Sequence, residues 1–492
     1  MAHSTILPDR AEKQQLSDGE RVSVPLAVDL DGTLIRTDSF IESLILLLKA
    51  KPLLLPVILI WLLKGKAYLK QQVSRRVTVD ISSLPYNLDI LVFLQDQYNS
   101  GRRLVLATGA DDSIAQQIAV YLHIFDEVIA SDGENNLTGV EKKERLAAEF
   151  GVRGFDYLGN DRKDLSVWQA ARRAMVVGSK TFIDRMRTRM SNVDKVFEVK
   201  TAGWPEWIRA LRLYHWLKNL LVFVPLLAAH RFNEISLITT LCKAFLSFGL
   251  CASSVYILND LLDLPEDRKH PRKRSRAFAS GILPLTTGLA TAPLLLGSSI
   301  AIGLTLPLPF LLMLGSYYTI TLAYSLRLKK IVILDVIILA TLFTVRMMAG
   351  SAAVDVWPSS WLLSHSMFLF IRLALVKRYA ELVTMRIEHG QAAKARSYVA
   401  SDSELLAAMG VASAFSSVLV LVLYISSDSA QFLYGHLNVI WLVCPALLYW
   451  RCYIWLTAHR GGMHDDPMIF ALKDRISRFI LLSTLIIMLL AI

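Results

Sequence analysis

The sequence from Tyr256 to Gly281 reads YILNDLLDLPEDRKHPRKRSRAFASG, and the rest of the chain is organised around this stretch. It follows a long apolar run. Its acidic and amide residues come first, and they are succeeded at once by Arg268, Lys269, Arg272, Lys273, Arg274 and Arg276. Asp260, Asp263 and Asp267 are spaced i, i+3, i+7, which predicts three carboxylates on one helix face. With Asn259 they form an oxygen-only set that suits Mg²⁺ shared with substrate phosphates. Basic side chains such as Lys273 and Arg276 are suited to gripping those phosphates.

This stretch therefore predicts a site for a Mg²⁺-diphosphate compound where a membrane helix meets water. The simpler interpretation is a solvated loop that follows the positive-inside rule. That interpretation accounts for the Lys and Arg residues. It does not account for three acidic residues in register at the end of an apolar helix.

The composition of the chain indicates a membrane protein with a separate globular part. Hydrophobic residues make up 54% of the 492 residues, and they are concentrated after about residue 210. The net charge of +11 does not indicate nucleic acid, because Lys and Arg lie between apolar runs, which favours a membrane surface and anionic substrates. The four cysteines lie in apolar runs without metal-ligand spacing. Residues 1–22 are predicted to be a polar tail without a signal peptide.

Four short apolar stretches in the first 200 residues predict strands that end in polar side chains. The predicted strands are 24–30, 103–107, 125–130 and 155–158, and the polar residues at or after their ends are Asp29, Asp31, Thr108, Lys142, Asp161 and Asp164. Alternation with helical segments predicts a doubly wound parallel sheet with its site at the carboxyl edge. There Asp29 could attack phosphorus, Asp31 could hand over a proton, and Thr108 could bind a phosphoryl oxygen.

Residues 24–195 resemble the haloacid-dehalogenase-like phosphatase superfamily, with all four of its motifs in order. The resemblance implies that Asp29 is the nucleophile, that Asp31 is the general acid/base, and that Thr108 and Lys142 hold the phosphoryl group. It implies one Mg²⁺ held by Asp161 with Asp29 and the carbonyl group of Asp31, and oriented by Asp164. Lys143 is the alternative to Lys142, and an inactive relic of the fold is the alternative to a phosphatase.

The predicted phosphatase domain covers residues 23–200 and includes a helical cap at about residues 40–98. Within the cap, Leu44 to Leu63 is almost entirely apolar but is interrupted by lysines and prolines. Two short helices of this kind are too interrupted to span a bilayer. We expect them to lie in the membrane interface, with Lys64, Lys66 and Lys70 facing headgroups. The alternative is an ordinary cap with a buried face.

After a connector at residues 201–210, residues 211–492 are predicted to form an all-α polytopic membrane domain with nine spans. The predicted spans are 213–229, 236–258, 283–302, 306–324, 331–350, 358–377, 407–426, 435–456 and 476–492. Most Lys and Arg residues of the predicted loops lie on the side of the phosphatase. The loops on the opposite side contain one basic residue, Arg231. By the positive-inside rule, both sites face the cytoplasm of a bacterial inner membrane.

Further polar residues gather at the same face and are predicted to bind the phosphates of a substrate. They are Arg212, Lys218, Tyr324, Lys329, Arg346, Lys377 and Arg378. Asp335 and Arg346 lie within the fifth predicted span, where ionisable groups are costly and usually functional. They are about three helical turns apart, so both could face one cavity, or the two could form a structural pair.

Residues 205–492 resemble the UbiA superfamily of intramembrane transferases, whose first Asp-rich motif matches Asn259–Asp267. The segments WLKNLLVFVPLLA (216–228), DRKHPRKRSRAFASG (267–281), LDVIILATLFTVRMMAG (334–350) and HDDPMIFALKDRIS (464–477) are most similar to the decaprenyl-phosphate phosphoribosyltransferase branch. After the sixth span, KRYAELVTMRIEHG lacks the second DxxxD motif of typical prenyltransferases, which makes a prenyl-diphosphate donor less favoured. The resemblance implies a phosphoribosyl diphosphate donor, a polyprenyl phosphate acceptor and at least one Mg²⁺, with Asp260 and Asp263 catalytic.

Together these features predict a bifunctional membrane enzyme. The membrane domain would transfer 5-phosphoribose to a polyprenyl phosphate, and the phosphatase would then remove the 5-phosphate. Two alternatives remain: an aromatic prenyltransferase with a separate phosphatase activity, and a transport or scaffold protein with a regulatory phosphatase-like domain. The predicted partners are the two substrates and the lipid bilayer, without nucleic acid, and a homo-oligomer is left open.

Overall fold

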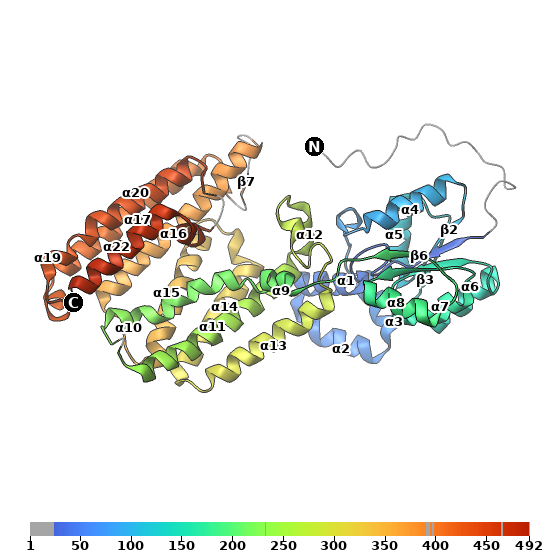
Figure 1. The fold of residues 1–492 in the computed structure, drawn as a ribbon, viewed down its shortest axis with the longest axis horizontal. Coiled ribbons are helices and arrows are strands. Elements are labelled where there is room, and N and C mark those ends of the chain that lie inside the picture. The colour runs from blue at the N-terminus through green and yellow to red at the C-terminus, as the bar shows by residue number, and fades with distance from the viewer. Residues whose placement is uncertain (1–23, 232, 390–393, 396–397, 464–465, 492) are drawn as a thin grey trace. The chain divides into compact units, whose positions relative to one another are not determined.

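The computed structural model describes residues 24–231, 233–389, 394–395, 398–463 and 466–491 (Figure 1). Contacts divide the chain into two units. The first contains residues 1–210 and 258–290, and the second contains residues 211–257 and 291–492. The acidic and basic stretch after residue 258 thus groups with the N-terminal residues. The predicted N-terminal tail lies outside the described residues.

Six parallel strands form the sheet of the first unit, in the order β3-β2-β1-β4-β5-β6. They are β1 (Leu26–Val28), β2 (Leu104–Asp111), β3 (Glu127–Ser131), β4 (Asp156–Gly159), β5 (Ala174–Gly178) and β6 (Val193–Glu198). The four predicted strands are confirmed as β1 to β4, and two further strands were missed. β1 pairs with β2 on one side and with β4 on the other, so the end of β1 lies where the strand order reverses, which is where ligands bind in such sheets.

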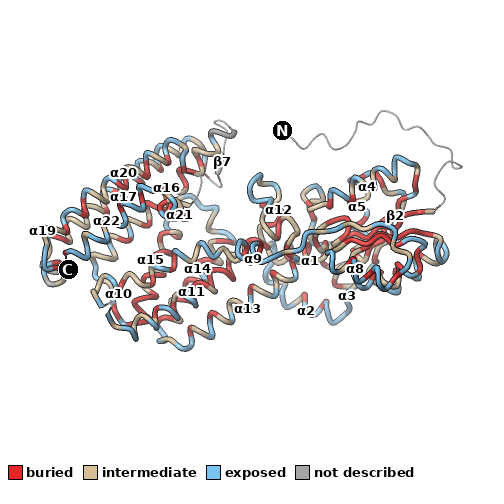
Figure 2. Tube along the Cα trace, viewed as in Figure 1, coloured by how far each residue is buried: buried red, intermediate tan, exposed pale blue. Residues whose placement is uncertain are grey.

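Helices cover both faces of this sheet, whose strands are largely buried (Figure 2). On one face, α4 (Leu88–Asn99) and α5 (Asp112–Leu122) contribute Ile90, Leu94, Ile114 and Ile118 to the core. The other face is covered by α6 (Val140–Phe150), α7 (Leu165–Ala170) and α8 (Lys180–Arg189). A doubly wound α/β architecture is thereby confirmed.

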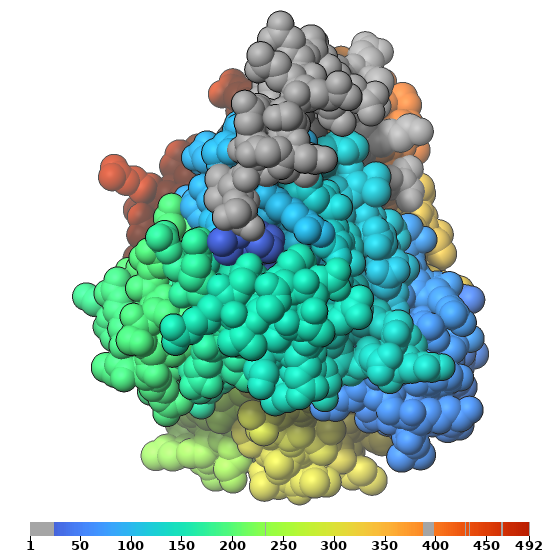
Figure 3. Space-filling view, turned by 90° about the vertical axis from the view of Figure 1, so that its right-hand side faces the viewer, coloured from blue at the N-terminus to red at the C-terminus, as the bar shows by residue number. Residues whose placement is uncertain are grey.

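The predicted pair of short apolar helices is also present. α1 (Ser39–Ala50) and the segment Pro52–Leu63, which contains α2 (Leu55–Leu63), meet at 117°. α3 (Lys66–Ser74) follows, and the three helices share a small core around Leu47, Ile58 and Trp61. In Figure 3 this cap (blue) forms the right-hand margin of the visible face.

The acidic motif does not lie on one continuous helix face, contrary to the prediction from its spacing. α11 (Ile235–Leu262) ends just before Asp263, and α12 (Leu264–Lys269) begins just after it. The cause is Pro265, which is tolerated in the first turn of a helix but not in its interior. Asp260 and Asp267 therefore belong to different helices, with Asp263 at the junction.

Among the described residues, six helical segments are long and apolar enough to cross a membrane. They are α11, α13 (Leu285–Gly303), α15 (Leu334–Val354), the part of α16 (Ser360–His389) that ends at Arg386, α17 (Asp402–Ile425) and Leu437–His459, which contains α20 (Val443–His459). The chain is thus a multi-span membrane protein. The other three predicted spans coincide with a shorter apolar segment, Leu213–Ala228, and with α14 (Leu308–Leu326) and α22 (Arg475–Ala491). The total of nine spans stays a prediction.

Candidate active sites

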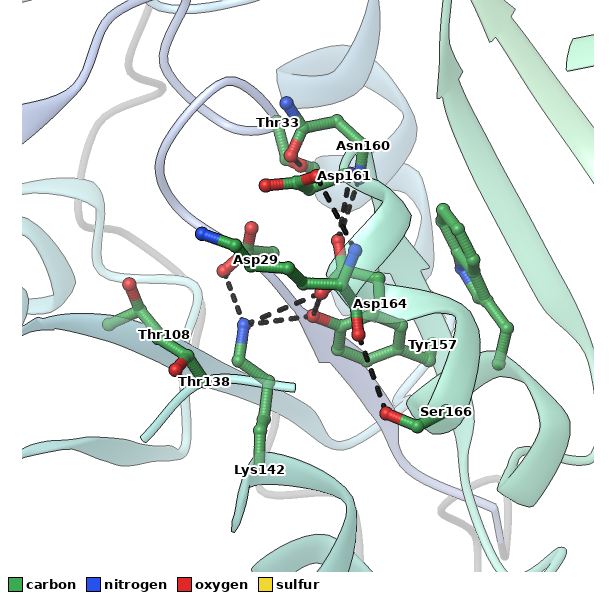
Figure 4. Close-up of polar contacts among 12 residues, drawn as sticks. Asp29, Thr33, Thr108, Thr138, Lys142, Tyr157, Asn160, Asp161, Asp164 and Ser166 are labelled. Carbon is green, nitrogen blue, oxygen red and sulfur yellow. Dashed lines mark hydrogen bonds and ion pairs between the residues drawn. The ribbon is translucent and has the colours of Figure 1, made fainter. Parts of the chain in front are cut away.

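The carboxyl edge of the sheet holds a buried polar network centred on Lys142, at the start of α6 (Figure 4). The Lys142 ammonium group donates to Asp29 Oδ1 at 2.7 Å and to the Tyr157 hydroxyl at 2.9 Å. Tyr157 in turn donates to Asp164 Oδ1 at 2.9 Å. The structure thus brings Asp29, Lys142 and Asp164 together, and Lys142 rather than Lys143 contacts Asp29. Tyr157, inside β4, was missed because a strand tyrosine ordinarily indicates only packing.

Burial and neighbouring charges shift the acid–base properties of this network. Burial raises the pKa of Asp29 to about 6, although Lys142 acts in the opposite direction. Burial, together with the nearby carboxylate of Asp38, raises the pKa of Asp31 to about 7. For Lys142, burial lowers the pKa, but the carboxylates of Asp29 and Asp164 outweigh burial and raise it. Both carboxyl groups therefore have raised pKa values, and a pKa of about 7 suits Asp31 to proton donation near neutral pH.

Gly32 makes the turn between Asp29 and α1 possible. Its φ of +75° is in the left-handed region, and a Cβ atom there would lie 2.1 Å from Asn160 Nδ2. Asn160, which was not among the predicted site residues, accepts a hydrogen bond from the Thr33 hydroxyl at 3.1 Å. The turn is thereby held against the end of β4. The Asp31 carboxylate accepts a hydrogen bond from the Ser39 backbone N–H at 2.8 Å, which orients it.

Asp161 and Thr108 are less closely involved. Asp161 caps a short helical turn, and its backbone N–H donates to Asp164 Oδ2 at 3.0 Å. Thr108 is fully buried within β2, which continues to Asp111 rather than ending at Thr108. Its hydroxyl oxygen accepts from the Ala110 N–H. In the described chain it does not line the cavity next to Asp29.

A cavity of about 550 Å³ opens at Asp29, and its walls come from three parts of the first unit. Asp29, Asp31, Lys142 and Asp161 come from the sheet edge, and Lys70 comes from α3 of the cap. The third wall is formed at and just after the end of the acidic and basic stretch, by Gly281, Pro284, Leu285 and Thr286. Lys70 was expected to face lipid headgroups. It instead donates to the Gly109 carbonyl at 2.6 Å and to Asn136 Oδ1 at 2.8 Å.

The acidic motif is held by cations. Arg276 donates to Asp260 Oδ1 at 3.1 Å and to Asp267 Oδ2 at 2.6 Å, and both carboxylates are buried. Burial raises the pKa of Asp267 despite the opposing effect of Arg276. Asn259 Oδ1 is buried and has no hydrogen-bond partner in the described part of the chain. A buried acceptor without a donor fits a cation ligand, as does the oxygen-only set.

Asp263 points to a different partner. Its carboxylate lies 3.4 Å from the Lys49 ammonium group of α1, which also contacts Glu266 at 2.8 Å. Next along the chain, Arg268 forms a buried ion pair with Glu42 of α1. Within residues 24–231, 233–389, 398–463 and 466–491, no three His, Cys, Asp or Glu side chains converge as a metal cluster. The predicted ligands in both sites therefore do not form a closed acidic cage.

In the second unit, the two ionisable residues of α15 have different partners. Arg346 donates to Asn219 Oδ1 at 2.9 Å and to the Tyr317 hydroxyl at 2.8 Å. Asp335 instead pairs with Arg378, and it accepts a hydrogen bond from the Tyr398 hydroxyl. The suggested pairing between Asp335 and Arg346 is therefore wrong. Both groups are buried, so each needs these partners.

The remaining predicted phosphate-binding residues are distributed over several elements. Lys218 contacts Asp466 at 2.6 Å, and Lys377 lies 3.6 Å from the same carboxylate oxygen. Burial alone would raise the pKa of Asp466, but these two ammonium groups hold it below its ordinary value. The Tyr324 hydroxyl accepts a hydrogen bond from Arg378. The Arg212 guanidinium group lies 4.9 Å from the centroid of the Tyr256 ring. Lys273 and Lys329 lie in short 3-10 helices. His464 and Asp465 lie outside the described residues.

Comparison with known proteins identifies the family of the helical part. Residues 220–472 match the UbiA prenyltransferase family. Across 93% of its length, the chain is 36% identical to the protein y4nM of Sinorhizobium fredii, and the alignment covers 89% of that protein. Two relatives align with only part of this chain. The nodulation protein NoeC of Azorhizobium caulinodans is 31% identical over 54% of this chain and 87% of its own length. The decaprenyl-phosphate phosphoribosyltransferase of Mycolicibacterium smegmatis is 31% identical over 58% of this chain and 92% of its own length.

The spans and the acidic motif describe a membrane transferase that is joined to a parallel α/β unit. The chain belongs to the UbiA prenyltransferase family.

Proposed function

We propose that this protein is a bifunctional enzyme that makes a polyprenyl-phosphoryl-ribose. The UbiA part would transfer 5-phosphoribose from phosphoribosyl diphosphate to a polyprenyl phosphate. The Asp29 site would then act as a haloacid-dehalogenase-like phosphatase and remove the 5-phosphate. The first step is supported by family membership and by similarity to a protein named decaprenyl-phosphate phosphoribosyltransferase.

The observation that carries the link between the two steps is the composite cavity at Asp29. Its third wall, residues 281–286, immediately follows the stretch that contains Asp260, Asp267 and Arg276. The same segment of chain would thus serve the transferase site and the phosphatase site. Residence of both sites in one chain also raises the local concentration of the intermediate.

In the transfer step, a phosphate oxygen of the polyprenyl phosphate would attack the anomeric carbon of the donor, and the bond from that carbon to the diphosphate would break. Asn259, Asp260, Asp263 and Asp267 would hold Mg²⁺. When bound, Mg²⁺ neutralises the diphosphate leaving group. Lys273 and Arg276 follow on the same segment, and Arg212, Lys218, Tyr324, Lys329, Arg346, Lys377 and Arg378 are the further phosphate-binding candidates. Charge that develops on the ribose ring would be stabilised by the surrounding anions.

In the phosphatase step, the Asp29 carboxylate would attack phosphorus and displace the ribose 5-oxygen, which would take a proton from Asp31. Water, deprotonated by Asp31, would then release phosphate from Asp29. Lys142 and Thr108 would hold the phosphoryl oxygens. Asp29, the Asp31 carbonyl group and Asp161 would hold the Mg²⁺ ion that neutralises charge there, with Asp164 orienting them. The raised pKa of Asp31, about 7, supports its role as proton donor near neutral pH.

Both sites would face the cytoplasm of a bacterial inner membrane, because Lys and Arg crowd the loops that contain the acidic motif. Phosphoribosyl diphosphate would then be available from the cytoplasm, and the bilayer would supply the polyprenyl phosphate.

Mass spectrometry of the lipid products tests both steps. Purified full-length protein would receive phosphoribosyl diphosphate, a polyprenyl phosphate and Mg²⁺, in parallel with Asp29→Asn, Asp260→Asn and an exposed control, Asp112→Asn. We expect ribosyl lipid from the wild type and from Asp112→Asn, phosphoribosyl lipid from Asp29→Asn, and neither product from Asp260→Asn.

The outcomes separate the two halves of the proposal. Ribosyl lipid made by Asp29→Asn at the wild-type rate would remove the phosphatase assignment and leave the transferase intact. A wild type that makes no ribosylated lipid, but prenylates an aromatic acceptor from a prenyl diphosphate, would replace the donor assignment with the aromatic prenyltransferase alternative.

A further inference from the structure

Helix α2 presents an apolar surface that no described residue of the first unit covers. Ile58 and Trp61 point into the small core of the cap, whereas Leu55, Leu59, Ile60 and Leu62 are exposed. The residues at the two ends of the segment are the most exposed, Leu53 at 91% and Leu63 at 88%. A contiguous apolar patch of this kind is unusual on a water-facing surface and indicates an interaction site. In Figure 2 this helix is largely coloured as exposed.

The charged residues that flank this patch in the sequence are of one sign. Between Glu42 and Asp80 the sequence contains no acidic residue. Lys51 precedes α2, and Lys64 and Lys66 follow it, and all three are exposed. Leucines bordered by lysines complement a bilayer that contains anionic headgroups, because the leucines can enter the acyl boundary while the ammonium groups stay in the headgroup layer.

The cap is tied to a segment that emerges from a membrane span. Lys49, near the end of α1, contacts Glu266, which lies four residues after the end of span α11 at Leu262. Glu42, near the start of α1, pairs with Arg268. Both contacts lie within the first unit. The chain itself therefore keeps α1 and α2 close to a membrane surface, which favours lipid over a soluble protein as the occupant of the patch.

The geometry also distinguishes lying in the interface from crossing the bilayer. α2 has nine residues, or about 13 Å of helix, whereas a hydrocarbon core is about 30 Å thick. The 117° angle between α1 and the Pro52–Leu63 segment prevents the two from acting as one straight span.

We infer that the Pro52–Leu63 segment is a membrane-docking helix, which inserts its exposed leucines into the interface of an anionic phospholipid bilayer. α3, which follows directly, contributes Lys70 to the Asp29 cavity. Docking would thus hold one wall of that cavity at the bilayer surface. The inference does not depend on which reaction the cavity supports.

Depth-dependent fluorescence quenching tests the inference on the full-length protein. The two exposed free cysteines, Cys242 and Cys452, would be replaced by serine. Leu59→Cys or Leu63→Cys would then be labelled with an environment-sensitive fluorophore, while Cys251 and Cys444 stay buried, in nanodiscs of phosphatidylcholine and phosphatidylglycerol with or without doxyl-labelled lipid. Val152 is the matched control, because it is 73% exposed and precedes β4, at the sheet edge opposite Asp29.

We expect doxyl lipid to quench the probes at positions 59 and 63 at least twofold, and to leave the probe at position 152 unchanged. Replacement of Lys51, Lys64 and Lys66 by glutamine should weaken the quenching at both positions. Equal quenching at all three positions, or none at 59 and 63, would overturn the inference. Protection of positions 59 and 63 from aqueous iodide without quenching by doxyl lipid would also overturn it, and would point to a protein partner or a second copy of the chain.

Discussion

Arg268 and Glu42 form a buried ion pair that joins two segments of the first unit far apart in sequence. Arg268 Nη2 donates to Glu42 Oε2 at 3.1 Å, and Arg268 Nε donates to the Ala279 carbonyl at 3.0 Å. One guanidinium group therefore links α1 to both ends of the segment that follows the acidic motif. Because both side chains are nearly inaccessible to water, neither can easily be left without its partner.

The Glu42→Ala substitution should detach the segment that follows the acidic motif from helix α1 of the cap. Removal of one partner from a buried ion pair leaves an uncompensated charge, which costs about 3–5 kcal/mol. We expect faster hydrogen–deuterium exchange of the amides in residues 264–281, measured by mass spectrometry on the full-length protein. Lys269→Ala is the control, because its pair with Asp80 is exposed and should contribute little to stability. Equal exchange in the two variants would contradict a structural role for the buried pair.

Asn259→Ala should weaken metal binding at the acidic motif. The Asn259 Oδ1 atom is a buried acceptor without a donor among the described residues, as expected for a group that completes a cation site. We expect the Mg²⁺ concentration for half-maximal transfer to rise by roughly tenfold or more. Titration with Mn²⁺ followed by electron paramagnetic resonance, in an Asp29→Asn background, would measure the affinity directly. Asn135→Ala, in an exposed turn, is the control, and an unchanged Mn²⁺ affinity in Asn259→Ala would exclude this residue as a ligand.

Lys70→Met should impair substrate binding at the Asp29 cavity more than it impairs chemistry. Lys70 is the cation that the cap contributes to this cavity, and its hydrogen bonds go to the Gly109 carbonyl and Asn136 rather than to Asp29 or Asp31. Loss of one charge-assisted phosphate contact should raise KM about tenfold, with a smaller change in kcat. Phosphate release from a phosphoribosyl lipid would measure both parameters. Arg75→Met, at the exposed C-terminal end of the same helix, should leave KM unchanged; a matching rise in both variants would indicate a general effect on lipid association.

Asp156→Asn should destabilise the first unit, and it should do so only above acidic pH. Burial alone would raise the pKa of Asp156, but hydrogen bonds from Arg172 and Arg102 hold it below its ordinary value. A depressed carboxyl pKa contributes stability above the unfolded value, about 3.9, and that stability disappears as pH falls through the lower folded value.

At pH 7 we expect a loss of about 3 kcal/mol, or roughly 5–10 °C in the unfolding midpoint of this unit, in calorimetry of the full-length protein. The difference from wild type should shrink steadily below about pH 4, because a protonated Asp156 forms no ion pair. Asp194→Asn, which breaks an exposed pair with Arg173, is the control. A difference that persists at pH 3 would mean that the carboxylate charge is not the source of the stability.

The sequence was most informative for residues whose position follows directly from the strand that precedes them. Asp29 and Asp161 were placed near one sheet edge because each follows a buried parallel strand, and such strands end at a common edge. The prediction that three carboxylates share one helix face used only their spacing and did not take Pro265 into account. A proline between Asp263 and Asp267 interrupts the helix on which these carboxylates were expected to align. The strand Ala174–Gly178 was overlooked although its apolar composition is typical of a buried strand.

Other features depend on contacts that no local pattern encodes. The inward direction of Lys70 could not be predicted, because a lysine near apolar helices is equally suited to solvent or headgroups. The contribution of residues 281–286 to the Asp29 cavity arises from tertiary packing. The sequence feature that reflects this packing is Gly281. Its φ is +73°, and a Cβ atom there would lie 2.4 Å from the Arg36 carbonyl oxygen. A glycine needed for close backbone approach is visible in a sequence, but its partner is not.

The composite wall of the Asp29 cavity also has a consequence for biogenesis. N-terminal domains generally fold first as a chain leaves the ribosome, so the sheet and cap can form while the later segments are still being synthesised. Residues 281–286 emerge only after the apolar helix that ends at Leu262 has been made and can engage the insertion machinery. The cavity therefore reaches its final shape only after this helix is available for insertion into a membrane. An immature chain released before that point would carry an open cavity that lacks its third wall.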